Sequence, residues 1–142
     1  IMASILKVDE MQGVTSAGNI TITGEGTATM QLQQGVAKAW HNFTMISSNT
    51  TRDSFNISSF TDNGSGDATT SYTNDFANIN YVIAGVSGES GSTGTNDVYM
   101  TVARSSNYSD SMKVGSTRVT SVSDASTKVD RDIFLNMHGD LA

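Results

Sequence analysis

The chain has 142 residues, a length that suits one compact domain with a core of its own. It carries 8 basic and 14 acidic residues, and this net charge of −6 argues against a nucleic-acid-binding face. The chain has no cysteine, which excludes disulfides and thiolate metal sites, and no apolar run approaches the ~20 residues that span a bilayer. We therefore expect neither nucleic-acid binding nor membrane insertion.

Residue preferences favour strands and turns. The β-branched residues Thr, Val and Ile are frequent, the strong helix formers Leu, Glu, Lys and Arg are few, and only 15% of the residues are charged. Clusters of Gly, Ser, Asn and Asp separate short strand-type segments. The sequence therefore predicts an all-β protein in which no segment strongly predicts a helix, although residues 123–129, "SDASTKV", could make one helical turn.

The first 35 residues predict three short strands, over 4–8, 19–23 and 27–33. In the third of these, Ala28, Met30 and Leu32 share one face. A thin meander with one apolar face needs a partner to cover it. That partner is either the following domain or other copies of the chain.

From residue 36 the pattern is that of a longer sheet. Ala37, Ala39, His41 and Phe43 fall on one face of a predicted strand, and Lys38, Trp40 and Asn42 fall on the other. In the next strand, Phe55 and Ile57 are predicted to share the inward face. Five further strands are predicted over 68–73, 81–86, 98–103, 117–122 and 133–137. This series of short strands predicts a β-sandwich or barrel.

Two polar stretches interrupt the strands. Residues 87–96, "SGESGSTGTN", form the longest low-complexity break, and we expect an exposed hairpin loop there. Residues 62–67, "DNGSGD", resemble part of a calcium loop. Counted from Asp62, however, the sixth position is Asp67 and the twelfth is Thr73, where an EF-hand needs Gly and Glu. Asn-Gly and Gly-Asp pairs are strong turn signals, so we predict a turn that ends a strand, and no metal site.

No arrangement of residues marks a catalytic site. His41 and His138 are the only histidines, and no nucleophile elbow is present. His41 lies within a predicted strand and His138 follows one, and both positions favour packing or an interface. Glu10, Glu25 and Glu89 are scattered and define no carboxylate pair. We therefore predict a protein that is not an enzyme and uses no cofactor; a glycan depolymerase stays open as the enzymatic alternative.

Side chains that could meet glycans fall in two groups. Six sequons, which begin at Asn19, Asn42, Asn49, Asn56, Asn63 and Asn107, are interpreted as products of the high Ser, Thr and Asn content. Among the aromatic residues, Trp40 is expected to pack in the core. Tyr72 and Tyr108 lie near polar loops, where an exposed ring could stack on a sugar.

Several segments carry a family resemblance. "ILKVDEMQG" (5–13) followed by "AGNITITG" (17–24) resembles the entry to the C-terminal part of tail fibre proteins of marine and cyanobacterial phages. Four further segments resemble the β-rich domain of the same proteins: "GVAKAWHNF" (35–43), "RDSFNISSFTDNGSGD" (52–67), "NDFANINYVIAG" (74–85) and "DIFLNMHGD" (132–140). Residues 87–128 are largely unmatched.

The resemblance implies a homotrimeric virion appendage, assembled in the cytoplasm of the host bacterium. It implies an all-β chain in which residues 36–142 form a β-sandwich, jelly-roll-like head. Residues 1–35 would attach it to other virion proteins or interlock the trimer. The expected function is attachment to a host-surface glycan or protein; the alternative is a head fibre, decoration or tail-junction protein with a purely structural role. The candidate receptor-contact residues are Ser87, Glu89, Ser92, Thr95, Asn96 and Tyr108.

Overall fold

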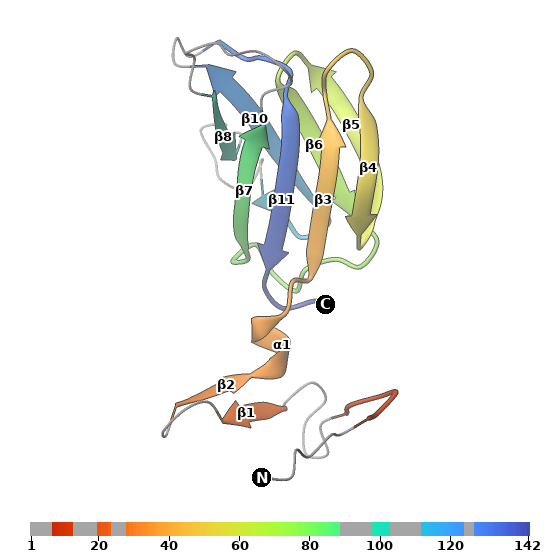
Figure 1. Ribbon diagram of the computed structural model, residues 1–142, viewed down its shortest axis with the longest axis vertical. Helices are drawn as coiled ribbons and strands as arrows, with labels where there is room; N and C mark the ends of the chain where they lie inside the picture. Colours follow the sequence, from red (N-terminus) through yellow and green to blue (C-terminus); the bar gives the residue numbers. More distant parts are fainter. Residues whose placement is uncertain (1–6, 13–19, 24–27, 89–97, 103–111, 124–126) are drawn as a thin grey trace. The chain divides into compact units, whose positions relative to one another are not determined.

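The computed structural model describes residues 7–12, 20–23, 28–88, 98–102, 112–123 and 127–142 (Figure 1). By its internal contacts the chain divides into two units, Ile1–Val36 and Ala37–Ala142. Within the described ranges, no helix has the length and apolar character needed to cross a membrane.

The first unit contains one small hairpin and one helical turn. Strand β1 (Thr21–Thr23) pairs antiparallel with β2 (Thr29–Gln31), and α1 (Leu32–Gly35) follows at once. The helix corrects the prediction that residues 27–33 form one strand. The sequence of α1 is LQQG, and Leu and Gln favour helix, so the strand ends before them. The strand predicted over 4–8 is also wrong in its described part, because residues 7 and 8 are not in a strand.

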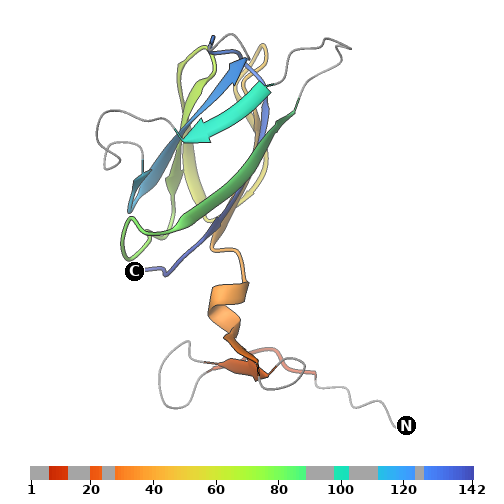
Figure 2. The same cartoon turned by 90° about the vertical axis from the view of Figure 1, so that its left-hand side faces the viewer.

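The second unit is a sandwich of two antiparallel sheets, which confirms the predicted fold class (Figures 1 and 2). One sheet has the strand order β4-β3-β11-β7. The other has the order β5-β6-β10-β8, and the short β9 also pairs with β10. The strands are β3 (Ala39–Thr44), β4 (Thr50–Phe55), β5 (Ile57–Gly64), β6 (Asp67–Tyr72), β7 (Val82–Gly88), β8 (Val98–Val102), β9 (Met112–Lys113), β10 (Ser116–Ser123) and β11 (Asp132–His138).

Alternating side chains of the central strands fill the core between the sheets. On β3, Ala39, His41 and Phe43 are buried while the residues between them are partly exposed, as the sequence predicts. Strand β11 repeats the pattern with Ile133, Leu135 and Met137. The facing sheet contributes the inward side chains of β6 and β10. The buried members of those two strands are Asp67, Ala68, Thr70, Tyr72, Thr117, Val119, Thr120 and Ser121.

His41 links the two sheets through hydrogen bonds. Its Nδ1 lies 2.9 Å from Thr70 Oγ1 of β6, and its Nε2 lies 2.8 Å from Thr51 Oγ1 of β4. The rings of Phe43 and Phe60 pack against the imidazole. Burial lowers the pKa of His41 to about 4, because the charged ring would lose its hydration. His41 is therefore a neutral core residue, which confirms the predicted packing role.

A second cluster inside the sandwich is built from aromatic rings and hydroxyl groups. The Tyr72 and Tyr81 hydroxyls both hydrogen-bond to Thr117 Oγ1, the Tyr81 contact being 2.6 Å long. Phe76 stacks on Tyr81 and meets Tyr72 edge to face. Burial raises the pKa of both tyrosines, so their hydroxyls stay protonated, and that of Tyr81 donates to the backbone carbonyl oxygen of Lys113 at 2.9 Å. Tyr72 is 5% exposed, so the interpretation of this ring as a sugar-stacking group is wrong.

Asn56 carries the chain from one sheet to the other. The sequence predicts Phe55 and Ile57 on the inward face of one strand, but Phe55 ends β4 and Ile57 begins β5 in the opposite sheet. Asn56 between them has a φ of 58°, a left-handed conformation that breaks the alternation of an extended strand. As a result Phe55 points into solvent, and the predicted shared face is wrong.

The predicted turn at residues 62–67 is confirmed as the hairpin between β5 and β6. Gly64 and Gly66 both have positive φ, which the turn requires. The carboxylate of Asp67, at the end of this turn, is held by two cationic side chains. Arg118 donates a hydrogen bond to each of its oxygens at 2.7 Å, and Lys128 contacts it as well. Burial alone would raise the pKa of Asp67, but these hydrogen bonds outweigh it and lower the pKa to about 2.

Candidate binding face

The solvent side of the sheet β4-β3-β11-β7 carries the exposed side chains of Phe55, Val82, Val86 and Phe134. We call it the outer face. The strand registers arrange it in rows: Phe55, Trp40, Asn136 and Ala84 are neighbours in one row, and Asp53, Asn42, Phe134 and Val86 form the next. With Val82, the outer face therefore comprises Trp40, Asn42, Asp53, Phe55, Val82, Ala84, Val86, Phe134 and Asn136.

Large apolar groups of the outer face are well exposed. Phe55 is 53% exposed and Phe134 40%, while Trp40 between them is partly buried. On β7, Val82 and Val86 are 64% and 62% exposed. Single exposed apolar residues are ordinary on protein surfaces, but several on adjacent strands of one sheet make this face a candidate interaction surface.

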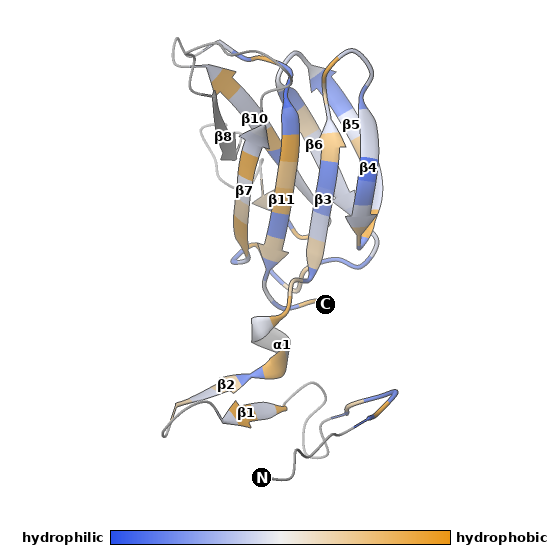
Figure 3. Cartoon of the chain, in the orientation of Figure 1, coloured by the Kyte–Doolittle hydropathy of each residue, from blue (hydrophilic) through white to orange (hydrophobic). Residues whose placement is uncertain are grey.

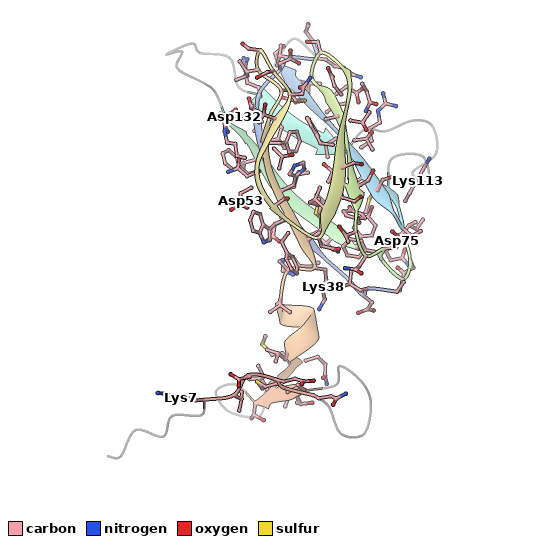
Figure 4. All side chains as sticks on the ribbon, turned by 90° about the vertical axis from the view of Figure 1, so that its right-hand side faces the viewer. Lys7, Lys38, Asp53, Asp75, Lys113 and Asp132 are labelled. Atoms are coloured by element: carbon pink, nitrogen blue, oxygen red, sulfur yellow. The ribbon has the colours of Figure 1, made fainter. Side chains whose placement is uncertain are left out.

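Polar groups stand between the rings. Asn136 pairs with Trp40 across β11 and β3, and Asn42 pairs with Phe134. Asp53 is exposed beside Asn42 on β4. Figure 4 shows Asp53 and Asp132 on the same side of the sandwich, with Asp75 and Lys113 on the opposite side. At the end of the outer face, Asp132 accepts a 2.8 Å hydrogen bond from Arg52, and this pair lowers the pKa of Asp132 against the opposing effect of burial.

This combination of groups has a defined chemistry. An exposed aromatic ring offers a flat apolar surface to the C–H groups of a ligand, and a neighbouring amide donates and accepts hydrogen bonds. The two rows described above contain one carboxylate, that of Asp53, and no cationic side chain. The outer face therefore suits an uncharged, hydroxyl-rich ligand with apolar C–H surfaces.

The candidate receptor-contact residues predicted from the sequence do not lie among the residues of the outer face. Of the candidate receptor-contact residues, Ser87 lies in β7 and pairs with Ile133 of β11. The remaining candidates, Glu89, Ser92, Thr95, Asn96 and Tyr108, lie outside the described residues. Their role as receptor contacts stays a prediction.

The expected hairpin at residues 87–96 is wrong in its pairing. Ser87 and Gly88 still belong to β7, and β7 pairs with β11 while β8 pairs with β10. The two strands that flank this segment therefore belong to different sheets. The polar composition predicted a break in the strands but could not reveal that the chain changes sheets there.

Trp40 was the missed signal. Aromatic residues at strand positions favour core packing, which predicts a core position for Trp40, yet the alternation of β3 places Trp40 on the side opposite His41 and Phe43. The same alternation on β11 places Phe134 outside, between the buried Ile133 and Leu135. The period of two was therefore a better guide to these rings than residue type.

The described histidine and aspartate side chains in the core are engaged by other protein groups. His41 is 1% exposed and contacts threonine hydroxyls on both sides. Asp67 is held by Arg118 and Lys128. Across the described ranges, no cluster of three or more His, Asp or Glu side chains is placed to hold a metal ion.

Comparison with known proteins adds no family assignment. No family model, curated protein or solved structure matches the chain significantly.

Proposed function

We propose that the chain is a binding component of a phage virion, a homotrimeric tail fibre-like appendage that helps attach the particle to its host. The proposal takes its biological setting from the sequence resemblance at residues 35–43, 52–67, 74–85 and 132–140. It takes its mode of action from the outer face, which is the observation that carries it. The chain would assemble with other virion proteins in the cytoplasm of the host bacterium, and it would act by binding rather than catalysis.

A host-surface glycan is the ligand class that the outer face favours. Phe55, Trp40 and Phe134 offer three rings within two adjacent rows. Asn136, which is exposed and lies opposite Trp40, supplies an amide that can hydrogen-bond to the hydroxyls of a sugar stacked on that ring. Exposed tyrosine, tryptophan and amide groups are also what adaptable binding surfaces use, because they combine contact area with hydrogen bonding at low entropic cost.

The first unit supports an attachment role. Ile22 and Met30 are opposite each other in the β1–β2 hairpin, and both are exposed. A two-stranded hairpin is at best marginally stable by itself. We therefore assign residues 1–35 to contacts with other virion proteins or with the other chains of the trimer.

A purely structural appendage, such as a head fibre, decoration or tail-junction protein, is the second candidate. It is favoured by the exposed Val82 and Val86 of β7, which suit packing against another protein chain. Immunogold labelling of purified virions with an antibody against the chain separates the two. Label at the distal end of a fibre supports attachment, whereas label on the capsid or at the tail junction supports the structural role.

Glycan binding is tested on an array of bacterial surface polysaccharides. We expect the purified protein to bind a neutral glycan, and we expect Trp40→Ala and Phe134→Ala to weaken binding at least tenfold. Thr61→Ala, at an exposed position on β5 of the opposite sheet, is the matched control and should bind normally. Binding that survives both ring substitutions would contradict the assignment to the outer face.

A further inference from the structure

Strand β7 ends its sheet without the usual protection of an edge strand. Its sequence, VIAGVSG, contains no charged residue and no proline. It pairs with β11 in an unbroken register from Val82 opposite His138 to Gly88 opposite Asp132. Natural edge strands usually carry charges, proline or bulges, because an unprotected edge is a template for another strand. Figure 3 shows β7 mostly in the colours of apolar residues.

Other edges of the sandwich are protected. Strand β4 ends the same sheet on the opposite side, carries Arg52 and Asp53, and has a register shift against β3. Strand β5 ends the second sheet and has two register shifts against β6. The fourth edge, β8, has the sequence VYMTV and resembles β7 in carrying no charge and no proline, so β7 is the unprotected edge of its own sheet.

We propose that β7 pairs with β7 of a second copy of this chain. An antiparallel pairing about a two-fold axis at Ala84 places Val82 opposite Val86 of the second copy, and Val86 opposite its Val82. Ala84 then meets its own equivalent. On the outer face every pair across the junction is apolar, so the strand is complementary to itself, as a two-fold contact requires.

The charges on β7 and β11 do not oppose the pairing of two copies at this edge. The chain has a net charge of −6, so two copies repel each other in general. β7 adds no charge to the junction, and the nearest carboxylate on its neighbour β11, that of Asp132, is already paired with Arg52. The β7 edge therefore lets two copies meet without unpaired like charges.

The pairing would join two outer faces into one surface. The four-stranded sheets of the two copies would form a continuous eight-stranded sheet, with the rows of Trp40 and Phe134 on both sides of the junction. Two linked binding faces gain avidity for a repetitive ligand. A two-fold contact cannot close a three-fold ring, so in a trimeric appendage it would connect one trimer to another. The inference does not depend on the virion assignment.

A single cysteine tests the geometry directly, since the chain has none of its own. Opposed Cβ atoms in an antiparallel sheet are about 5 Å apart. That separation lets Ala84→Cys form a disulfide across the two-fold axis after a small adjustment. Thr61→Cys on the exposed face of β5 is the control. Under mild oxidation of the full chain, we expect Ala84→Cys to become a covalent dimer at least tenfold faster than Thr61→Cys. Equal rates would overturn the proposal.

Native mass measurement over a range of concentrations tests the unmodified edge. We expect an even-numbered assembly, a dimer or a pair of trimers, that dissociates in Val86→Lys and persists in Thr61→Lys. Val86 points into solvent, so the lysine does not disturb the core. An assembly that Val86→Lys leaves unchanged, or a chain without even-numbered assemblies, would contradict the pairing. Neither readout involves ligand binding, so a failure here is distinct from a failure of the proposed function.

Discussion

Trp40 of β3 lies directly opposite Asn136 of β11 in the antiparallel register, and Phe55 of β4 flanks Trp40 on its other side. This row combines two aromatic rings with an amide on the solvent side of the sheet. Because His41 and Phe43 take the inward positions of β3, Trp40 is free to contact a ligand while the core stays intact. One side of β3 therefore builds the core, and the other side contributes to the proposed binding face.

Acid is expected to destabilise the protein through His41. Its pKa in the folded state is about 4, below the ordinary value of 6.5, so the unfolded chain takes up a proton between these values and the folded chain does not. The contribution of neutral His41 to the free energy of unfolding is therefore fully present above pH 6.5 and is lost as the pH drops towards 4. At about 1.4 kcal/mol per pKa unit, this loss is up to about 3 kcal/mol. Urea unfolding at several pH values measures the slope. In His41→Gln the loss attributable to His41 should disappear; an unchanged slope would contradict the assignment.

Gly66 is expected to tolerate no side chain. A Cβ there would lie 2.4 Å from the backbone nitrogen of Val129 and 2.6 Å from the carbonyl oxygen of Ser121. Its φ of 61° adds strain for any other residue. We expect Gly66→Ala to lower the free energy of unfolding by about 2–5 kcal/mol. Gly64→Ala is the control, because no atom lies within 4 Å of its Cβ and only backbone strain of about 1–2 kcal/mol remains. If chemical denaturation gives the same loss of unfolding free energy for Gly66→Ala and Gly64→Ala, the steric clash at Gly66 is contradicted.

Asn56 is expected to be required at the crossing between the sheets. Its side-chain nitrogen donates to the carbonyl oxygens of Lys38 and Asn74, each at 3.0 Å, and its Oδ1 accepts the Asn74 backbone N–H at 2.7 Å. Asn56→Asp keeps the shape but points an anion at two carbonyl oxygens. We expect a loss of about 2–4 kcal/mol in thermal or urea unfolding.

The control for Asn56 is Asn78→Asp. Asn78 is exposed and uses only its oxygen, which accepts the Asn80 backbone N–H at 2.8 Å. An aspartate at position 78 preserves that hydrogen bond, so we expect Asn78→Asp to be as stable as the unsubstituted protein. A similar loss in both variants would show that added negative charge, and not the lost donor, causes the effect.

Local patterns predicted much of the sandwich. The alternation around His41 and the glycines of the 62–67 turn depend on neighbouring residues only, so they could be predicted from the sequence. The crossing at Asn56 could not, because its left-handed conformation is stabilised by Lys38 and Asn74, which are distant in sequence.

The binding face was harder to predict for the same reason. Trp40, Phe55 and Phe134 come from three strands, and only the sheet order β4-β3-β11-β7 brings them together. That order joins strands far apart in the chain, and strand pairing of this kind leaves no local signal. The polar stretch at 87–96 can be recognised from its composition alone, whereas the outer face can be recognised only once the order of the strands in the sheet is known.

Trp40 fluorescence tests the central claim most directly. Trp40 is the only tryptophan of the chain and lies within the proposed binding face, so its emission reports on that face alone. The account predicts a saturable change in emission when neutral glycans purified from the host surface are added, and loss of the response in Phe134→Ala with the Thr61→Ala response intact. Glycan binding, measured independently by calorimetry, that leaves the Trp40 emission unchanged would contradict the account.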